Sequence, residues 1–184
     1  MDNRNVLDKY KDNRYFKWTA ELIKKDIQSK SFPFAVLMEH FIGDFTIGSV
    51  LRSCNFLGGE KMFYYGSRSW DRRSAVGVQN YTDMINIKTE EELIGLKKDY
   101  VFVALENNID GTEPLNDFVW PTEKKCLIIL GEEGVGITKQ TLSHCDKFVT
   151  ITGYGSVRSL NAGLAGGIAM QDYVAKYLRE HRES

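Results

Sequence analysis

The chain has 184 residues and a formal net charge of −1, with 42% hydrophobic and 27% charged residues. These values are typical of one globular domain with a sizeable core, and a net charge so close to zero argues against wholesale binding of a polyanion. The apolar runs are only a few residues long and Met1 leads into charged residues, so we expect neither a membrane span nor a secretory signal, and therefore a cytoplasmic protein.

The first segment is expected to be a helical arm from Asn3 to Gln28, because its apolar residues recur at spacings of three and four. Basic residues, including Lys9 and Arg14, alternate with aromatic ones, a combination that suits phosphates and bases of nucleic acid. Residues 1–30 hold eight Lys or Arg against five Asp or Glu, whereas residues 83–133 hold five against twelve. A basic end and an acidic body would orient a polyanion, although the arm could equally pack on the domain with its lysines in solvent.

A strand–helix–strand unit is expected next, with a strand at Phe34–Met38, a helix at Ile47–Leu57 and a strand at Lys61–Tyr65. The first strand is continuously apolar, as in sheets covered on both faces. Such a parallel crossover is expected to be right-handed.

The loop over residues 67–79 is compact, basic and aromatic, since Arg68, Arg72 and Arg73 surround Trp70. We expect this loop to contact phosphates, the alternative being simple surface charge.

The remaining strands and helices alternate, which predicts an α/β fold with a mostly parallel sheet and helices on both faces. Residues 114–121 fit no regular element, and the three cysteines (Cys54, Cys126 and Cys145) are too widely spaced for a disulfide framework or a metal site. The expected elements are strands around Ile85–Ile87, Tyr100–Leu105, Cys126–Leu130 and Lys147–Ile151, with helices at Glu90–Lys97, after Thr138 and up to about Arg179.

A glycine-rich turn precedes the last helix, and its position at the carboxyl end of a strand makes it a candidate site. In that helix Leu160, Leu164 and Ile168 recur every four residues, and Ala162, Gly163, Ala165, Gly166 and Gly167 are small. Something is expected to pack very close to it, whether a ligand site lies there or the helix merely crosses a neighbour tightly.

Three segments in order resemble the SpoU/TrmH family of SPOUT RNA 2'-O-methyltransferases. The first is Thr46-Ile-Gly-Ser-Val-Leu-Arg52 followed by Gly58-Gly59, where the family has Asn at the position of Thr46. The second is an apolar strand followed by Gly131-x-Glu133-Gly134-x-Gly136, and the third is Ser159-Leu160-Asn161 at the start of a helix. The resemblance covers about residues 34–178.

This resemblance implies a C-terminal trefoil knot, S-adenosylmethionine as cofactor, and a homodimer in which each site is completed by the partner. It divides the chain into an N-terminal helical extension, residues 1–32, and a SPOUT methyltransferase domain, residues 33–184. The expected substrate is structured RNA, with tRNA first because the chain lacks room for a separate RNA-binding domain, and rRNA second.

The site residues implied by the resemblance fall into three groups. The expected catalytic residues are Thr46, Arg52, Glu133, Ser159 and Asn161. Those expected at the cofactor are Leu105, Glu106, Leu130, Gly131, Gly134, Ile151 and Leu160. Those expected to contact RNA are Lys9, Arg14, Arg68, Arg72 and Arg73.

Two other functions stay open at this point. A non-catalytic RNA-binding module with the same fold would fit the replacement of Asn by Thr46. A Rossmann oxidoreductase would need a GxGxxG after the first strand, which the sequence lacks, and the segment from Gly131 to Gly136 lacks the Lys-Ser/Thr of a phosphate-binding loop.

Overall fold

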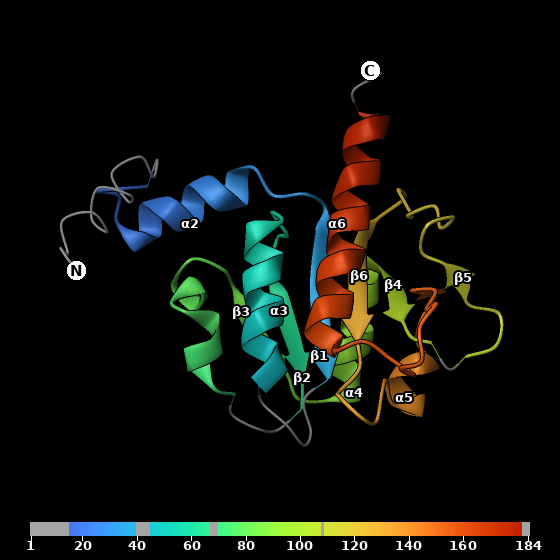
Figure 1. The fold of residues 1–184 in the computed structure, drawn as a ribbon. Helices are drawn as coiled ribbons and strands as arrows, with labels where there is room; N and C mark the ends of the chain where they lie inside the picture. Colours follow the sequence, from blue (N-terminus) through green and yellow to red (C-terminus); the bar gives the residue numbers. More distant parts are fainter. Residues whose placement is uncertain (1–14, 40–44, 67–69, 108, 182–184) are drawn as a thin grey trace.

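The computed structural model describes residues 15–39, 45–66, 70–107 and 109–181 of the chain, in which one seven-stranded sheet forms the centre of the fold (Figure 1). The strand order is β3-β2-β1-β6-β4-β7-β5, and all neighbouring strands are parallel. The α/β class and the parallel sheet are therefore confirmed. The strands are β1 (Phe34–Glu39), β2 (Met62–Tyr65), β3 (Met84–Ile87), β4 (Tyr100–Leu105), β5 (Glu113–Pro114), β6 (Lys125–Leu130) and β7 (Lys147–Thr150).

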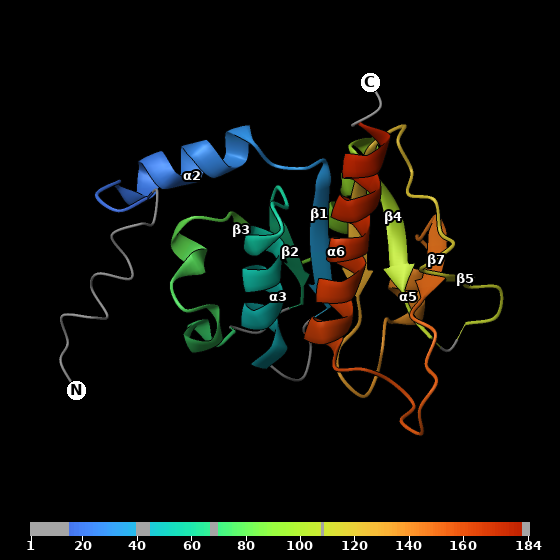
Figure 2. The same ribbon diagram turned by 45° about the horizontal axis from the view of Figure 1, so that its top comes forward.

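Helices cover both faces of the sheet because the central strands are apolar on both sides. On one face, Phe34 and Val36 of β1 pack in the same core as α3 (Phe45–Phe56) and α6 (Ala162–Glu180). On the other face, Ala35 and Leu37 pack in the core that includes α4 (Glu90–Gly95) and the end of α5 (Lys139–Leu142). Figures 1 and 2 show α3 and α6 side by side on one face. Short 3-10 turns complete the fold: η1 (Arg72–Ala75), η2 (Val78–Asn80) and η3 (Leu96–Lys98).

The N-terminal helix α2 (Ala20–Ser29) is shorter than predicted. Thr19 ends the non-helical stretch, and its side chain accepts a hydrogen bond from the backbone N–H of Leu22, so the helix begins at this cap rather than running through Tyr15–Thr19. The rest of the predicted arm, residues 1–14, lies outside the described part. Helix α2 is tied to the loop before β3, because Lys24 and Gln28 both donate to the carboxylate of Asp83.

Helix α6 packs as closely as its small residues predicted, but its periodic apolar face points away from the core. A Cβ on Gly166 would lie 2.6 Å from Leu130 Cδ1, so that position accepts no larger side chain without rearrangement. Tyr173 and Val174 belong to the buried face, whereas Leu164 and Ile168 remain exposed.

The stretch that showed no pattern, residues 114–121, is fastened to α6 by tertiary contacts. The ring of Trp120 lies 5.2 Å from that of Tyr173, and its Nε1 donates to Asp172 at 2.9 Å. Lys176 Nζ donates to the carbonyl oxygens of Leu115 and Phe118 at 2.7 and 2.9 Å. Leu115, Phe118 and Trp120 are buried for that reason, although the chain after β5 forms no regular element there.

The cysteines are free thiols, and burial raises the pKa of Cys54 and Cys126 to about 12, which makes both unreactive near neutral pH. Within the described residues, no helix is long and apolar enough to cross a membrane, and no cluster of three or more His, Cys, Asp or Glu could hold a metal ion.

Candidate functional site at the carboxyl edge of the sheet

The carboxyl ends of the central strands align at one edge of the sheet. Leu105 at the end of β4 is in register with Leu130 of β6 and with Val149 of β7. Ile151 follows β7 directly and is half-buried. The loops that leave these strands therefore start at one level, which is where open parallel sheets place their ligands.

The loop after β6 folds back on itself in a tight turn. A Cβ on Gly131 would lie 2.1 Å from the carbonyl carbon of Gly136, so only glycine allows the two strands of the turn to meet. Glu132 and Gly136 exchange two backbone hydrogen bonds, of 2.9 and 3.3 Å. Gly134 has a φ of +83°, and no atom lies within 4 Å of where its Cβ would be, so the tip of the turn is open to solvent. Glu133 is exposed beside it.

Thr46, Glu133 and Asn161 meet, although they come from the three separate motifs. Thr46 Oγ1, in the first turn of α3, donates to Glu133 Oε1 at 2.7 Å. Asn161 Nδ2 donates to the same carboxylate oxygen. Three of the five predicted catalytic residues are thus joined at one atom.

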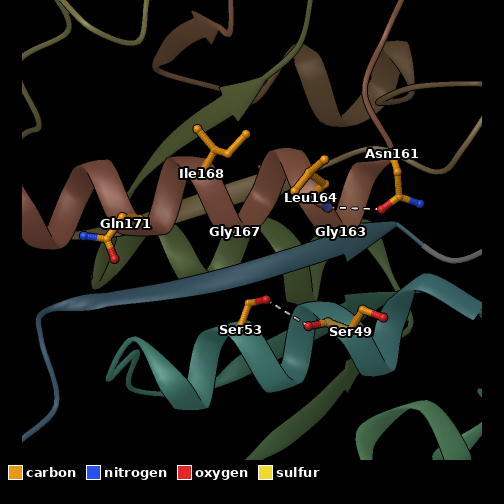
Figure 3. A pocket seen from close by; sticks show the side chains of 8 residues that line it. All are labelled: Ser49, Ser53, Asn161, Gly163, Leu164, Gly167, Ile168 and Gln171. Carbon is orange, nitrogen blue, oxygen red and sulfur yellow. Dashed lines mark hydrogen bonds between the residues drawn. The ribbon is translucent and has the colours of Figure 1, made fainter.

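Asn161 also caps α6. Its Oδ1 accepts a hydrogen bond of 3.1 Å from the backbone N–H of Leu164 (Figure 3). Because its amide donor is engaged by Glu133 and its carbonyl oxygen by the helix, this side chain fixes the start of α6 relative to the turn after β6.

Other predicted cofactor and catalytic residues lie around this junction without a shared contact. Ser159 and Leu160 are exposed in the segment just before Asn161. That segment is tied to the end of β4 through Asn107, whose Nδ2 donates to the carbonyl oxygen of Arg158 at 2.7 Å. Glu106 has a supporting position: its Oε2 accepts the backbone N–H of Ile137 at 3.2 Å, next to Gly136.

Arg52 does not join the junction of Thr46, Glu133 and Asn161. It is exposed on α3, six residues after Thr46, which corresponds to a rotation of roughly 240° around the helix and a rise of about 9 Å. No hydrogen bond or ion pair links Arg52 to another residue in the described ranges. The predicted catalytic set is therefore divided within one chain.

The predicted RNA loop lies against α3. A Cβ on Gly48 would lie 2.6 Å from the backbone nitrogen of Ala75, so η1 packs directly on that helix. Arg73 Nε donates to both oxygens of Asp71, at 3.0 and 2.8 Å. These hydrogen bonds lower the pKa of the Asp71 carboxyl below its usual value. Arg72 is exposed and forms no ion pair within the described residues, whereas Lys9, Arg14 and Arg68 lie outside the described ranges.

A groove of about 460 Å³ separates α3 from α6 (Figure 3). Ser49 and Ser53 line its α3 side, and Asn161 stands at one end. None of the residues of the turn from Gly131 to Gly136 lines this groove. Its α6 side consists of Gly163, Leu164, Gly167, Ile168 and Gln171.

With this geometry in hand, comparison with known proteins identifies the family, because residues 33–171 match the SpoU rRNA Methylase family. The chain belongs to the SpoU family of RNA 2'-O-methyltransferases. The match covers more than half of the chain and includes all three motifs.

Curated SpoU relatives are similar over most of the chain at low identity. One is an uncharacterized tRNA/rRNA methyltransferase of Borreliella burgdorferi, 27% identical over 171 residues, which are 90% of this chain and 71% of the relative. Another is the 23S rRNA (guanosine-2'-O-)-methyltransferase of Photorhabdus laumondii, 24% identical over 77% of this chain and 59% of its own length. The chain thus spans about three fifths of that second relative.

Solved SpoU structures show the same fold. The TrmH/SpoU tRNA modifying enzyme of A. aeolicus aligns with a TM-score of 0.74 at 17% identity, over 88% of this chain and 86% of its own. The SpoU methyltransferase AviRb of Streptomyces viridochromogenes, in complex with the cofactor AdoMet, aligns with a TM-score of 0.68 at 22% identity, over 79% and 58%. This shared SpoU fold implies the C-terminal knot that the sequence resemblance predicted.

One polar residue of the SpoU site region was missed by sequence reasoning. Glu39 ends β1 with no exposed surface and accepts hydrogen bonds from Thr138 and Thr141 at the start of α5. The sequence does contain a sign of this role, because Glu39 directly follows five apolar strand residues. A carboxylate at such a buried position needs hydrogen-bond donors around it.

Proposed function

We propose that this chain transfers the methyl group of S-adenosylmethionine to a ribose 2'-hydroxyl of structured RNA. The observation that carries the proposal is the junction of Thr46, Glu133 and Asn161, which brings the three family motifs together at the carboxyl edge of a SpoU-type sheet. A non-catalytic RNA-binding module would not require three motifs to converge on one carboxylate oxygen.

The residues at that edge fit S-adenosylmethionine. Leu105, Leu130 and Ile151 offer apolar surface and backbone groups at the ends of their strands, and the turn at Gly131 and Gly134 lets a ligand approach the backbone without Cβ atoms in the way. Leu160 is exposed directly before Asn161, and Glu106 supports the turn. When bound there, the cofactor supplies an electrophilic methyl group. Similar proteins support this choice, since AviRb has been solved with AdoMet.

The chain's own residues orient the ribose and stabilise the charge that develops on its 2'-oxygen. Arg52 stays protonated, because a guanidinium has a pKa above about 12, so it acts as a donor fork rather than as a free base. Held against the target phosphate and the 2'-oxygen, it orients the ribose and stabilises the developing alkoxide, while a phosphate oxygen or water takes the proton. Ser159 contacts the ribose. Thr46 and Asn161 position Glu133 at the reacting centre.

The proposed RNA surface consists of Arg72 and Arg73 on η1 and of the N-terminal extension, residues 1–32, attached to the methyltransferase domain, residues 33–184. Arg68, Lys9 and Arg14 remain predictions. Our first choice of substrate is tRNA, supported by the A. aeolicus tRNA modifying enzyme, of which this chain covers 86%. Ribosomal RNA is second, supported by the 23S rRNA methyltransferase, of which the chain covers 59%.

The working unit in this proposal is a two-fold dimer that buries the groove between α3 and α6. Leu164 and Ile168 are 56% and 38% exposed and stand beside Gly163 and Gly167 on the same face. The two glycines let α6 lie close to α3, since a Cβ on Gly163 would be 3.1 Å from Thr46 Cγ2. The exposed leucine and isoleucine beside them are apolar surface that the same face of a second copy can cover in an isologous interface. The site then also receives Arg52 from the second copy, since Arg52 does not join the junction within its own chain.

The test combines cofactor binding with product analysis. We expect calorimetry to detect binding of S-adenosylmethionine to the purified chain, and mass spectrometry of nucleosides to detect a 2'-O-methylated ribose in RNA from cells lacking the gene after incubation with the protein. Binding without methylation of tRNA or rRNA would favour the non-catalytic RNA-binding module. Absence of both would overturn the proposal.

A further inference from the structure

The turn after β6 is held from both sides by carboxylates, because β6 lies between β1 and β4 in the sheet. Met38 and Leu105 are both in register with Leu130, so the next residues, Glu39 and Glu106, stand level with the start of the turn. One carboxylate thus flanks each side of the segment that carries Glu133.

Glu39 makes the more extensive set of contacts. Its Oε2 accepts the backbone N–H of Thr138 at 2.7 Å, and its Oε1 accepts the hydroxyls of Thr138 and Thr141 at 2.6 and 2.5 Å. Glu39 and Thr141 are both fully buried. A buried carboxylate is tolerated only when donors surround it, and here all three donors come from the end of the turn and the start of α5.

Glu106 holds the other side of the turn. Its Oε2 accepts the N–H of Ile137 at 3.2 Å, one residue before the N–H that Glu39 accepts. A Cβ on Gly136 would lie 2.6 Å from the same oxygen, which shows how closely the carboxylate approaches the backbone. Consecutive N–H groups of the turn therefore point to carboxylates on opposite neighbouring strands.

We propose that Glu39 is a positioning residue of the methyl-transfer site, an inference that rests on the proposed function. By fixing Thr138 to the end of β1, it sets where the turn from Gly131 to Gly136 ends, and with it the backbone that faces the cofactor and the place of Glu133 beside Thr46 and Asn161. Glu39 itself, being buried, contacts neither cofactor nor RNA.

The experiment compares Glu39→Ala with Glu39→Gln in the full chain. Alanine leaves the Thr138 N–H and two hydroxyls without a buried acceptor, so we expect the dissociation constant for S-adenosylmethionine to rise at least about tenfold and kcat to fall, with RNA affinity unchanged. Glutamine has the same shape, and its oxygen can accept the Thr138 N–H while its amide donates to the two hydroxyl oxygens. We therefore expect glutamine to restore cofactor affinity to within about threefold of wild type.

The matched control is Asp172→Ala, which also removes a carboxylate with two donors, Trp120 and Lys176, but far along α6 from the turn. It should lower the melting temperature without changing cofactor affinity, which separates positioning from general destabilisation.

Hydrogen exchange of the Ile137 and Thr138 amides gives an independent readout, and it should speed up in Glu39→Ala alone. If Glu39→Ala does not fold, Thr141→Val removes one donor with little change of shape, and it should weaken cofactor binding while leaving RNA affinity intact. Wild-type cofactor affinity and kcat in folded Glu39→Ala, or in Thr141→Val where the alanine variant does not fold, would overturn the proposal. Failure of the wild-type protein to bind S-adenosylmethionine would instead count against the proposed function.

Discussion

Thr46 provides a hydroxyl where the SpoU/TrmH motif has an asparagine, and that hydroxyl still reaches Glu133 at 2.7 Å. Its methyl group is also accommodated, because a Cβ on Gly163 would lie only 3.1 Å from Thr46 Cγ2. The replacement therefore keeps a donor to the carboxylate and fills the space against α6. Nothing in this geometry requires a loss of activity.

The hydroxyl of Thr46 can be tested without changing the volume of the side chain. Thr46→Val removes the donor but keeps the shape, and loss of a hydrogen bond to a charged group costs about 1.5 to 3 kcal/mol, so we expect single-turnover methyl transfer to slow by roughly tenfold to a hundredfold. Thr46→Ser keeps the hydroxyl and should stay within a few-fold of wild type. Equal rates in the valine and serine variants would show that the bond to Glu133 contributes nothing to turnover.

At the scale of single residues, the sequence identified the members of the junction but not how they meet. Glu133 and Asn161 were recognisable from their motifs, whereas their bond to one another joins positions 28 residues apart and depends on the knotted arrangement. Glu39 was overlooked because its donors, Thr138 and Thr141, follow about 100 residues later and carry no motif.

At the scale of elements, strands were easier to predict than helix faces. The continuous apolar run Phe34–Met38 predicted a strand that is covered on both sides. In the structure this run lies in β1, and every residue of it is buried. The four-residue repeat of Leu160, Leu164 and Ile168 indicated a helix, but α6 begins only at Ala162, so Leu160 precedes it. Leu164 and Ile168 lie on the exposed side of α6, and its buried side consists of Gly163, Gly166, Ala169, Met170, Tyr173 and Val174. A periodic pattern gives the period of an element, and tertiary packing decides which side faces inward.

The loop containing η1 was predicted to contact RNA through three arginines, of which the structure describes Arg72 and Arg73 and shows them in different surroundings. Arg73 is bonded to Asp71, and these hydrogen bonds lower the pKa of the Asp71 carboxyl. Arg72 is exposed beside it. The packing of Gly48 against Ala75 holds the loop to α3, so its charge is presented at a fixed place.

We therefore expect Arg72→Ala to weaken RNA binding more than Arg73→Ala. Each phosphate contact that is lost should reduce the slope of log K against log salt by about 0.7 to 0.9. Filter binding across a salt series measures this slope for both variants, and calorimetry should show unchanged cofactor affinity. A larger loss in Arg73→Ala would mean that the pair with Asp71 opens when RNA binds, and equal affinity in both variants would remove the loop from the RNA surface.

At the scale of the whole molecule, the parallel sheet followed from the alternation of strands and helices, but the strand order did not. The order β3-β2-β1-β6-β4-β7-β5 places β6 in the middle, between strands that precede it by long stretches of chain. That placement brings the ends of β1 and β4 to the two sides of the turn after β6. The site is thus a product of topology, which no local pattern encodes.

Arg52 lies apart from the three predicted catalytic residues that meet, and this bears on how two copies would assemble. Thr46, Glu133 and Asn161 meet in one chain, but Arg52 is exposed on another side of α3. Arg52 directly precedes Ser53, which lines the groove with α6. If a two-fold copy covers that groove, Arg52 of one copy can complete the junction of the other. Light scattering should then find a dimer at micromolar concentration, and Leu164→Glu should convert it to a monomer that has lost turnover.

Mixing two inactive variants distinguishes a shared site from two separate ones. Arg52→Ala and Glu133→Ala each inactivate both sites of their own dimer. When the two are unfolded together and refolded in equal amounts, half of the dimers are mixed, and each mixed dimer has one site with both residues intact if the site is shared between copies. Methyl transfer should then recover to about a quarter of the wild-type rate. If Arg52 and Glu133 of the same copy work together, every site in the mixture lacks one of them, and activity stays at the level of the separate variants. Refolded wild-type protein sets the reference rate. Using Arg52→Lys in place of Arg52→Ala tests whether a positive charge without the guanidinium fork is enough. We expect the lysine variant to remain inactive, because an ammonium cannot donate to two oxygens in parallel.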